Sequence, residues 1–589
     1  MQLGPDGRLV RDGLALELNP YCRRAVSEGV ELARTLGGTC TAITLGPPTA
    51  EDCLREAIAW GCDDGILITD PAFAGSDTIA TARALAAALA RLGEWDLILT
   101  GRNSVDADTG QVGPQVAELC DMAFAAGAKE ITVLDGRLRV RCEEDDGYSD
   151  RLVRLPAVIS CAERLCEPAK VDPDGRAAVD GSLLSVLTAA DLGSGPWGQA
   201  GSGTTVGEVR VLDVQRERRV LTGSAGAQVA EAVALLVSRG ALTLGDADGG
   251  ATRLRRDHSV VAEGPVIAVV IEPERANVAR ELLGAADGLA AEIGGAVVAV
   301  TATFPAIEPD MLGTWGADAV VAVEGAGSEE DVAAALAAWA SVAAPWAVLL
   351  PSTTWGREVG GRAAAILGAG LTGDAVELEV ERGSPPRLVA WKPAFGGRLV
   401  AAIHSLSPVQ MATVRPGVLR PPMARPAGPI PTSALAAAVR GRVTVTSSVR
   451  DDDVDVLAMA PFVVGVGGGV PPDEYGVIEA LADTLGAELA ATRKVTDKAW
   501  LPRARQVGLT GRSIAPHLYI AIGLSGKFNH TVGVRAARTV LAINQDPTAP
   551  IWDHADIGIV GDWRSVVPLL TASLSAAVAV AASVAASVR

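Results

Sequence analysis

Short apolar runs alternate with Ala-rich helical stretches along almost all of this chain of 589 residues. The clearest runs are residues 40–46, 65–70, 97–101, 265–272, 296–302 and 347–352. Such alternation predicts parallel sheets covered by helices on both faces, because a parallel crossover needs a connecting helix. We therefore predict an α/β fold of Rossmann-like domains, and the length leaves room for roughly three or four domains.

Two segments repeat the same order of features. Residues 97–120 and 347–367 each read as a strand, a polar loop with a hydroxyl and a Gly-containing helix start, and β structure follows each. Two similar α/β domains, one per half, would explain this repeat. Chance similarity between unrelated α/β units is the alternative interpretation.

Composition changes mark candidate boundaries. Residues 191–210 are rich in Gly and Ser and predict a loop or arm. Residues 415–431 are rich in Pro and predict a semi-rigid linker between domains. A weaker boundary lies near residues 245–264.

Charge and cysteine usage narrow the class of protein. Hydrophobic residues make up 49% and the net charge is −19, which argues against nucleic acid as a partner. No apolar run reaches membrane-spanning length, and residues 1–13 lack the apolar core of a signal peptide. All eight cysteines lie within the first 166 residues, without a CxxC pair or zinc-like spacing. We expect no metal, no disulfide and a cytoplasmic location.

The stretch "QVGLTGRSIAPHLYIAIGLSGKFNHTVG" covers residues 506–533. Residues 518–523 are apolar on both faces and predict a buried parallel strand. Glycines in residues 523–530 would let backbone N–H groups approach a phosphate or a polar ring edge. An ordinary strand-to-helix turn is the alternative, since Gly-rich loops give many false positives.

One set of motifs lies at residues 19–32, 106–120 and 155–170, and a second set at 350–364, 393–403, 410–417 and 506–563. Together, these motifs resemble an electron transfer flavoprotein with its β and α subunits fused in that order. The first set is β-like and the second set is α-like. The resemblance implies a β-like nucleotide-binding domain with a C-terminal arm at 1–244. It also implies an α-like N-terminal domain at 263–415 and a C-terminal FAD-binding α/β domain at 432–589.

The resemblance also implies the FAD contacts. Arg493 would lie against the isoalloxazine, Thr510 near flavin N5 and His530 at the N1–C2=O edge. A positive or donor group at that edge would stabilise the reduced flavin. The remaining implied contacts are backbone positions Gln506, Val507, Gly508 and Leu509, loop residues Ser525, Gly526 and Asn529, and the adenosine-end residues Asn544 and Asp562.

A second nucleotide, AMP or another FAD, is implied in the β-like half. Its implied contacts are Asn19, Pro20, Tyr21, Cys22, Asp106, Thr109, Gly110, Gln111 and Val112. The sequence departs from the family's pattern at Leu509 and Asn529, where relatives usually have glutamine. The segment after Pro168 also lacks the family's docking loop for acyl-CoA dehydrogenases.

The function implied is an FAD-containing electron carrier with no substrate turnover or catalytic residues of its own. It would accept electrons from a flavin-dependent dehydrogenase and pass them to a quinone-linked or other oxidoreductase. One alternative is a bifurcating relative with a second FAD in the β-like half. Another is a non-redox regulator that binds adenine nucleotides on the same scaffold.

Overall fold

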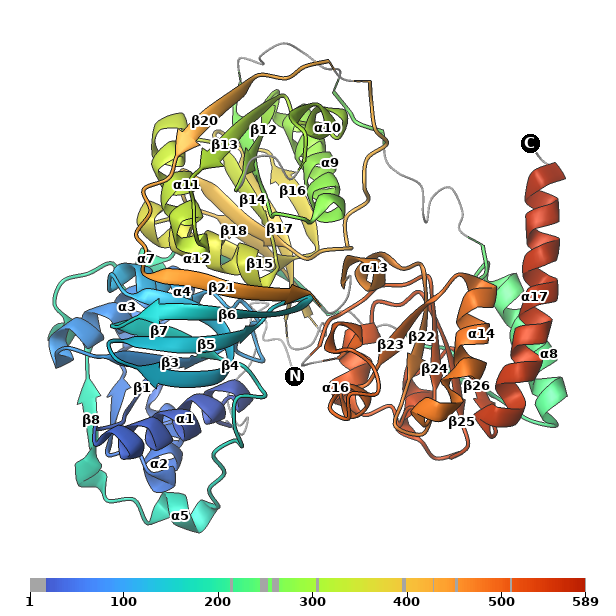
Figure 1. Cartoon of the computed structure of the whole chain (residues 1–589), viewed down its shortest axis with the longest axis horizontal. Helices are drawn as coiled ribbons and strands as arrows, with labels where there is room; N and C mark the ends of the chain where they lie inside the picture. The colour runs from blue at the N-terminus through green and yellow to red at the C-terminus, as the bar shows by residue number, and fades with distance from the viewer. Residues whose placement is uncertain are drawn as a thin grey trace.

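The computed structural model describes residues 17–211, 215–243, 253–256, 264–302, 307–394, 399–426, 428–450, 454–508 and 511–587. Figure 1 shows three bodies, which we call N-terminal (blue to teal), central (green to yellow) and C-terminal (orange to red). Each combines strands with helices, so the predicted α/β class is confirmed. Leu509 and Thr510 lie outside the described residues.

The N-terminal body contains two sheets. One is parallel, in the order β1 (Thr41–Leu45), β2 (Asp64–Ile68) and β8 (Leu184–Leu187). The other has the order β21-β6-β5-β4-β7-β3. Its own strands are β3 (Leu97–Gly101), β4 (Ala123–Leu134), β5 (Arg137–Glu143), β6 (Gly147–Arg154) and β7 (Ala157–Cys161). The main helices are α1 (Pro20–Leu36), α2 (Glu51–Trp60), α3 (Thr78–Leu92) and α4 (Val112–Leu119), and the short ones are α5 (Pro173–Ala177), α6 (Ala189–Leu192) and α7 (Gly198–Gly201).

The central body is built on a seven-stranded parallel sheet in the order β15-β19-β14-β11-β12-β13-β20. Its strands are β11 (Val266–Ile271), β12 (Ala296–Thr301), β13 (Ala319–Glu324), β14 (Ala347–Pro351), β15 (Leu371–Ala375), β19 (Gln410–Val414) and β20 (Thr432–Ala436). Helix α9 (Ala276–Ile293) packs on one face, while α11 (Glu329–Ala343) and α12 (Thr354–Leu367) pack on the other. Helix α10 is Pro309–Thr314, and an antiparallel sheet adds β16 (Glu377–Glu381), β17 (Arg387–Ala394) and β18 (Leu399–Ser405).

The C-terminal body has a six-stranded parallel sheet in the order β10-β26-β25-β24-β22-β23. Its strands are β10 (Arg219–Leu221), β22 (Phe462–Val466), β23 (Glu488–Ala491), β24 (Leu518–Ile522), β25 (Thr539–Asn544) and β26 (Ile557–Val560). Its helices are α8 (Ala225–Ser238), α13 (Val454–Met459), α14 (Tyr475–Leu485), α15 (Arg493–Thr496), α16 (Phe528–Thr531) and α17 (Trp563–Ser587). Every residue of β24 is buried, as the apolar run predicted.

Strands cross between the bodies. Strand β9 (Thr204–Val211) pairs with β18 of the central body, and β10 with β26 of the C-terminal body. In return, β21 (Val443–Arg450) pairs with β6 of the N-terminal body (Figure 1). Residues 432–450 thus pair with the central and N-terminal sheets, although they fall within the range expected for the C-terminal domain.

Both irregular segments that the composition marks have defined positions in the structure. Within the predicted loop or arm at 191–210, residues 204–210 belong to β9, which reaches the central body and pairs with β18. The expectation of a linker between domains at 415–431 is wrong. The Pro-rich segment 415–431 connects β19 to β20, two strands of one sheet, so it does not link two bodies. It is held on the central body, where Arg280 Nε donates to the Pro422 carbonyl at 2.9 Å. The expected boundary at 245–264 lies mostly outside the described residues.

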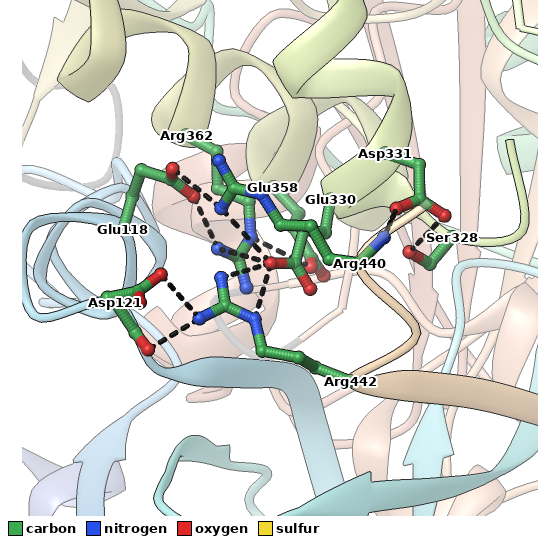
Figure 2. Close-up of polar contacts among 9 residues, drawn as sticks. All are labelled: Glu118, Asp121, Ser328, Glu330, Asp331, Glu358, Arg362, Arg440 and Arg442. Atoms are coloured by element: carbon green, nitrogen blue, oxygen red, sulfur yellow. Dashed lines mark hydrogen bonds and ion pairs between the residues drawn. The ribbon is translucent and has the colours of Figure 1, made fainter. Parts of the chain in front are cut away.

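The two repeated segments form β3 with α4 and β14 with α12, and the two helices pack on each other. A Cβ at Gly361 would lie 2.9 Å from Pro114, so glycine permits this close approach. Charged groups surround the contact: Arg362 and Arg440 both reach Glu118, at 2.7 and 2.8 Å (Figure 2). Arg442 lies between Asp121 and Glu330. This network joins the N-terminal and central bodies.

Candidate functional site

A cavity of about 840 Å³ lies where the three bodies meet. This volume is within the range of roughly 300–1,000 Å³ that is usual for small-molecule and cofactor sites. The cavity wall combines the loop after β3, the start of α12, the segment after β19 and the loop before β24. Much of the lining is at residues 102–106, 108, 110, 352–354, 357, 415–421, 506, 508 and 511–515.

Gln506 and Gly508 bring the first group of predicted FAD contacts to this wall. Gln506 is buried, and its amide oxygen accepts a hydrogen bond from Thr496 Oγ1 at 2.7 Å. Gly508 has φ of 135°, and a Cβ there would lie 2.2 Å from the Asn529 carbonyl oxygen. Only glycine therefore fits this close approach of two loops. Val507 between them is buried in the core of the C-terminal body.

His530 lies behind the same loop. Its Nδ1 donates to the Val507 carbonyl at 3.0 Å, so its Nε2 accepts from the Tyr519 hydroxyl at 2.7 Å. Burial lowers the pKa of His530 to about 4, so the ring is neutral at pH 7. We expected this ring to face a flavin edge. Instead both nitrogens bind protein groups, because Tyr519 on β24 and the Val507 backbone enclose the ring.

Arg493 begins α15, at the contact between the C-terminal and N-terminal bodies. Its guanidinium pairs with Glu163 of the N-terminal body and with Asp497, which lies 3.1 Å away on its own body. Arg164 forms a parallel ion pair with Asp497 at 2.8 Å. Arg493 thus joins two bodies, a role that the sequence did not predict.

The other predicted contacts follow the carboxyl ends of β24, β25 and β26, the edge where open α/β sheets bind ligands. After β24, Ser525 and Asn529 are exposed, and Gly526 has φ of 77°. Asn544, which ends β25, donates from Nδ2 to the Leu524 carbonyl at 2.6 Å. Asp562, after β26, accepts from the Arg564 backbone N–H at 3.0 Å at the start of α17.

The structure brings the two loops of the predicted second nucleotide site together. Asn19 Nδ2 donates to the Asn103 carbonyl at 2.8 Å, which ties the start of α1 to the loop after β3. Tyr21, Asp106 and Gly110 all line the cavity described above. Burial raises the pKa of Tyr21 to about 12, so the phenol stays protonated. Cys22 packs against Gly101, where a Cβ would lie 2.8 Å from the Cys22 backbone nitrogen.

The remaining residues of that group have structural positions. Pro20 is the exposed first residue of α1, and half-buried Val112 begins α4. Gln111 is fully buried between the N-terminal and central bodies. With its amide oriented to satisfy both ends, its nitrogen donates to Thr78 Oγ1 at 2.9 Å and to the Leu371 carbonyl at 3.1 Å. Thr109 lies beside Gly373 of the central body.

Sequence reasoning missed the arginines of the cavity wall. Arg102, Arg357 and Arg512 come from the N-terminal, central and C-terminal bodies respectively. Arg102 Nη2 donates to Thr354 Oγ1 at 3.1 Å, and Arg512 Nη2 donates to the Asp145 carbonyl at 3.2 Å. Each of the three follows a glycine, but Gly-Arg pairs also occur elsewhere in the sequence, so no local signal identifies these three arginines.

Two kinds of feature, a metal-binding cluster and a membrane-spanning helix, are absent from the described residues. Among the described residues, no cluster of His, Cys, Asp and Glu has the arrangement of a metal site. Within the same ranges, no helix is both long and apolar enough to cross a bilayer.

Comparison with protein families matches most of the chain. A model of the electron transfer flavoprotein domain matches residues 6–182 and 265–439, and a model of the electron transfer flavoprotein FAD-binding domain matches residues 456–535. The first model thus matches twice, once in each segment that carries a copy of the repeat.

Three relatives are each similar to about half of the chain or less. An electron transfer flavoprotein subunit alpha of Mycobacterium leprae is 36% identical over 324 residues, which cover 54% of this chain and 99% of the relative. The corresponding subunit of Thermoanaerobacterium thermosaccharolyticum is 36% identical over 306 residues, or 50% of this chain and 92% of the relative. Protein FixB of Azorhizobium caulinodans is 41% identical over 239 residues, or 39% of this chain and 64% of the relative.

Proposed function

Because the chain belongs to the electron transfer flavoprotein family, we propose that it is an FAD-containing carrier between two redox enzymes. It accepts electrons from a flavin-dependent dehydrogenase and passes them to another oxidoreductase, such as a quinone-linked one. The observation that carries this proposal is the cavity of about 840 Å³ beside Gln506 and Gly508, within the segment that matches the FAD-binding domain.

The donor groups of the cavity wall fit FAD. Arginines from three bodies can pair with a pyrophosphate, since guanidinium groups bind phosphate oxygens in a bidentate manner. Glycine at 508 and at 533 lets two loops pack backbone to backbone, because a Cβ at Gly533 would lie 2.4 Å from the Gly508 nitrogen. Bound FAD supplies reversible uptake of one or two electrons.

The protein's own residues hold and orient the cofactor in this proposal. Gln506 and Gly508 line the cavity, and buried Val507 between them anchors this segment to the core of the C-terminal body. His530 supports that loop from behind through the Val507 carbonyl. The strand-end residues Ser525, Gly526, Asn529, Asn544 and Asp562 bind the rest of the dinucleotide, and Arg493 acts at the contact with the N-terminal body.

A second adenine nucleotide in the N-terminal body is the finer proposal. Its support is the Asn19–Asn103 hydrogen bond, which joins the two predicted loops, together with Tyr21 and Asp106 at the cavity. With AMP there, the protein is a simple carrier, and with FAD there it is a bifurcating one.

An absorbance spectrum of the purified full chain, followed by nucleotide extraction, tests these proposals. One FAD per chain, reduced and reoxidised reversibly, is the expected result, and extracted AMP would indicate the simple carrier. Two FAD per chain would indicate bifurcation. A colourless protein that retains only adenine nucleotide would overturn the carrier and favour a non-redox regulator.

A further inference from the structure

Two cysteines that are distant in sequence lie in contact in the N-terminal body. The Sγ atoms of Cys40 and Cys62 are 3.6 Å apart. Cys40 directly precedes β1, and Cys62 lies between α2 and β2. Pairing of β1 with β2 in the register Thr41–Asp64 brings the backbones of these two positions close together. This proximity depends on sheet pairing, so no local spacing in the sequence reveals it.

The backbone around the pair is held in place. The Asp63 N–H donates to the Cys40 carbonyl at 2.8 Å, and the Cys40 N–H donates to Asp63 Oδ2 at 2.7 Å. These two bonds fix the residue next to Cys62 against Cys40. Disulfides need particular Cα and Cβ separations, and a fixed backbone with sulfurs already in contact meets that need with little movement.

The two thiols have different surroundings. Cys62 is buried in a small apolar cluster with Val30 and Ile58, whereas Cys40 is half-buried. A Cβ at Gly29 on α1 would lie 3.1 Å from Cys40 Sγ, so glycine leaves room for this sulfur. Cys40 is therefore the thiol that a small reagent can reach.

Their acidities also differ. A hydrogen bond from Cys62 lowers the pKa of the Cys40 thiol, although burial opposes this shift. The same hydrogen bond and burial raise the pKa of Cys62. Since the thiolate is the reactive form, Cys40 is the expected nucleophile and Cys62 the resolving thiol.

We propose that Cys40 and Cys62 are a redox modification site, at which a hydroperoxide converts the two thiols into a reversible disulfide. The Cys40 thiol gives its proton to solvent, and the thiolate attacks one oxygen of hydrogen peroxide and becomes a sulfenic acid. The O–O bond breaks, and the departing hydroxide takes up a proton from solvent to become water. The Cys62 sulfur then attacks the Cys40 sulfur, the S–O bond breaks, and the departing hydroxide takes up the Cys62 thiol proton to form a second water. Two thiols are oxidised, one peroxide is reduced and one S–S bond forms.

This site is separate from the proposed flavin site and does not depend on it. The bond would join the residue before β1 to the residues between α2 and β2, and so close a loop that contains α2. Closing a loop restricts the unfolded chain, which raises the stability of the folded body. Half-buried Cys53, which lies on α2 within this loop, instead donates to the Ala50 carbonyl at 2.9 Å.

Peptide mapping of the full chain with its bound flavin tests the proposal. Hydrogen peroxide is added, remaining thiols are alkylated after denaturation, and the protein is cleaved with trypsin. Cleavage after Arg34, Arg55 and Arg83 places Cys40 and Cys53 in residues 35–55 and Cys62 in residues 56–83. We expect these two peptides to be linked, with loss of two hydrogen masses, and the link to disappear after treatment with dithiothreitol.

Variants decide which thiols react. Cys40→Ser and Cys62→Ser should lose the link, whereas the control Cys53→Ser should keep it. Oxidised wild type should also unfold at a higher temperature than reduced wild type, and Cys40→Ser should lose this shift. A link that survives in Cys40→Ser, or a persistent sulfenic acid at Cys40 without any link in the native wild type, would overturn the proposal. If a variant fails to fold, fragmentation of the linked wild-type peptides decides the matter, because the alkyl label in residues 35–55 is on Cys53 when Cys40 forms the link and on Cys40 when it does not.

Discussion

The hydroxyl of Tyr519 lies 2.7 Å from Nε2 of His530, and both side chains are buried. Since Nδ1 of the same ring donates to the Val507 carbonyl, the imidazole is fixed in its neutral form between β24 and the loop at the cavity. A buried ring with both nitrogens bound holds that loop in position. It does not carry positive charge at neutral pH.

This arrangement predicts a loss of stability in acid. The folded pKa of about 4 is below the ordinary value of 6.5, so the unfolded chain binds more protons between these values. The stability supplied by neutral His530 is complete above pH 6.5 and falls as the pH drops towards about 4. The difference is on the order of 3 kcal/mol. Denaturant unfolding followed by flavin fluorescence from pH 7 to 4 measures it.

His530→Asn should show a shallower dependence of stability on pH than wild type. Equal slopes in wild type and His530→Asn would show that the buried ring does not titrate as described.

Gly508→Ala should greatly reduce FAD binding. The substitution places a Cβ 2.2 Å from the Asn529 carbonyl at a φ of 135°, so the loop beside the cavity must move. Strained backbone of this kind costs roughly 1–3 kcal/mol, which corresponds to a loss of affinity of about 5-fold to 150-fold. Flavin per chain after gel filtration measures the effect. Gly476→Ala is the control, because Gly476 lies in α14 with nothing within 4 Å of its Cβ position. Full flavin content in Gly508→Ala would contradict the assignment of this loop.

Much of this fold is readable from the sequence, and the reasons are local. The run at 518–522 is apolar on both faces, and this identifies β24 as a central strand. Strands that pair with a distant part of the chain are different. Strand β10 has only three residues, β9 and β21 are mostly exposed, and each of the three joins the sheet of another body. Their partners depend on how the bodies pack, which no local period encodes.

Some residues of the candidate site could be expected from the sequence, whereas the contacts that they make could not. Gly508 and Asn544 are implied as FAD contacts by the family resemblance and not by any local pattern, and the structure places Gly508 at the cavity and Asn544 at the end of β25. The charge partners of Arg493 and the contact between Cys40 and Cys62 could not be predicted, because each joins segments that only the tertiary structure brings together.

Glu358 on α12 predicts that alkaline conditions weaken the contact between the N-terminal and central bodies. Burial and the nearby Glu329 carboxylate raise the pKa of Glu358 to about 8, although Arg362 Nε lies 3.5 Å away and opposes the rise. The folded chain therefore holds a proton that the unfolded chain releases above about 4.5. Stability is complete below that pH and falls as the pH rises to about 8, by on the order of a few kcal/mol.

Glu358→Gln keeps the shape of the side chain and cannot ionise. Its thermal midpoint should exceed that of wild type at pH 8.5 and should change less between pH 6 and 8.5. Exposed Glu377 on β16 supplies the control, and Glu377→Gln should follow wild type. Identical behaviour of wild type and Glu358→Gln would mean that Glu358 is ionised in the folded protein throughout this range.

The ion pair between Arg493 and Glu163 should help to hold the C-terminal body against the N-terminal body. The two side chains pair across the contact between the bodies, next to the pair of Arg164 and Asp497 at 2.8 Å. Removing one partner from a bond to a charged group costs roughly 1.5–3 kcal/mol, so Arg493→Ala should populate additional orientations of the C-terminal body.

Spin labels at exposed Leu36 on α1 and Leu569 on α17 report the distance between the bodies. The distance distribution should broaden in Arg493→Ala and stay unchanged in Arg34→Gln, which removes only an exposed pair with Glu31 within α1. A distribution in Arg493→Ala that equals wild type would show that this pair does not hold the bodies together. The proposed carrier would then need another contact to control the approach of its flavin to donor and acceptor.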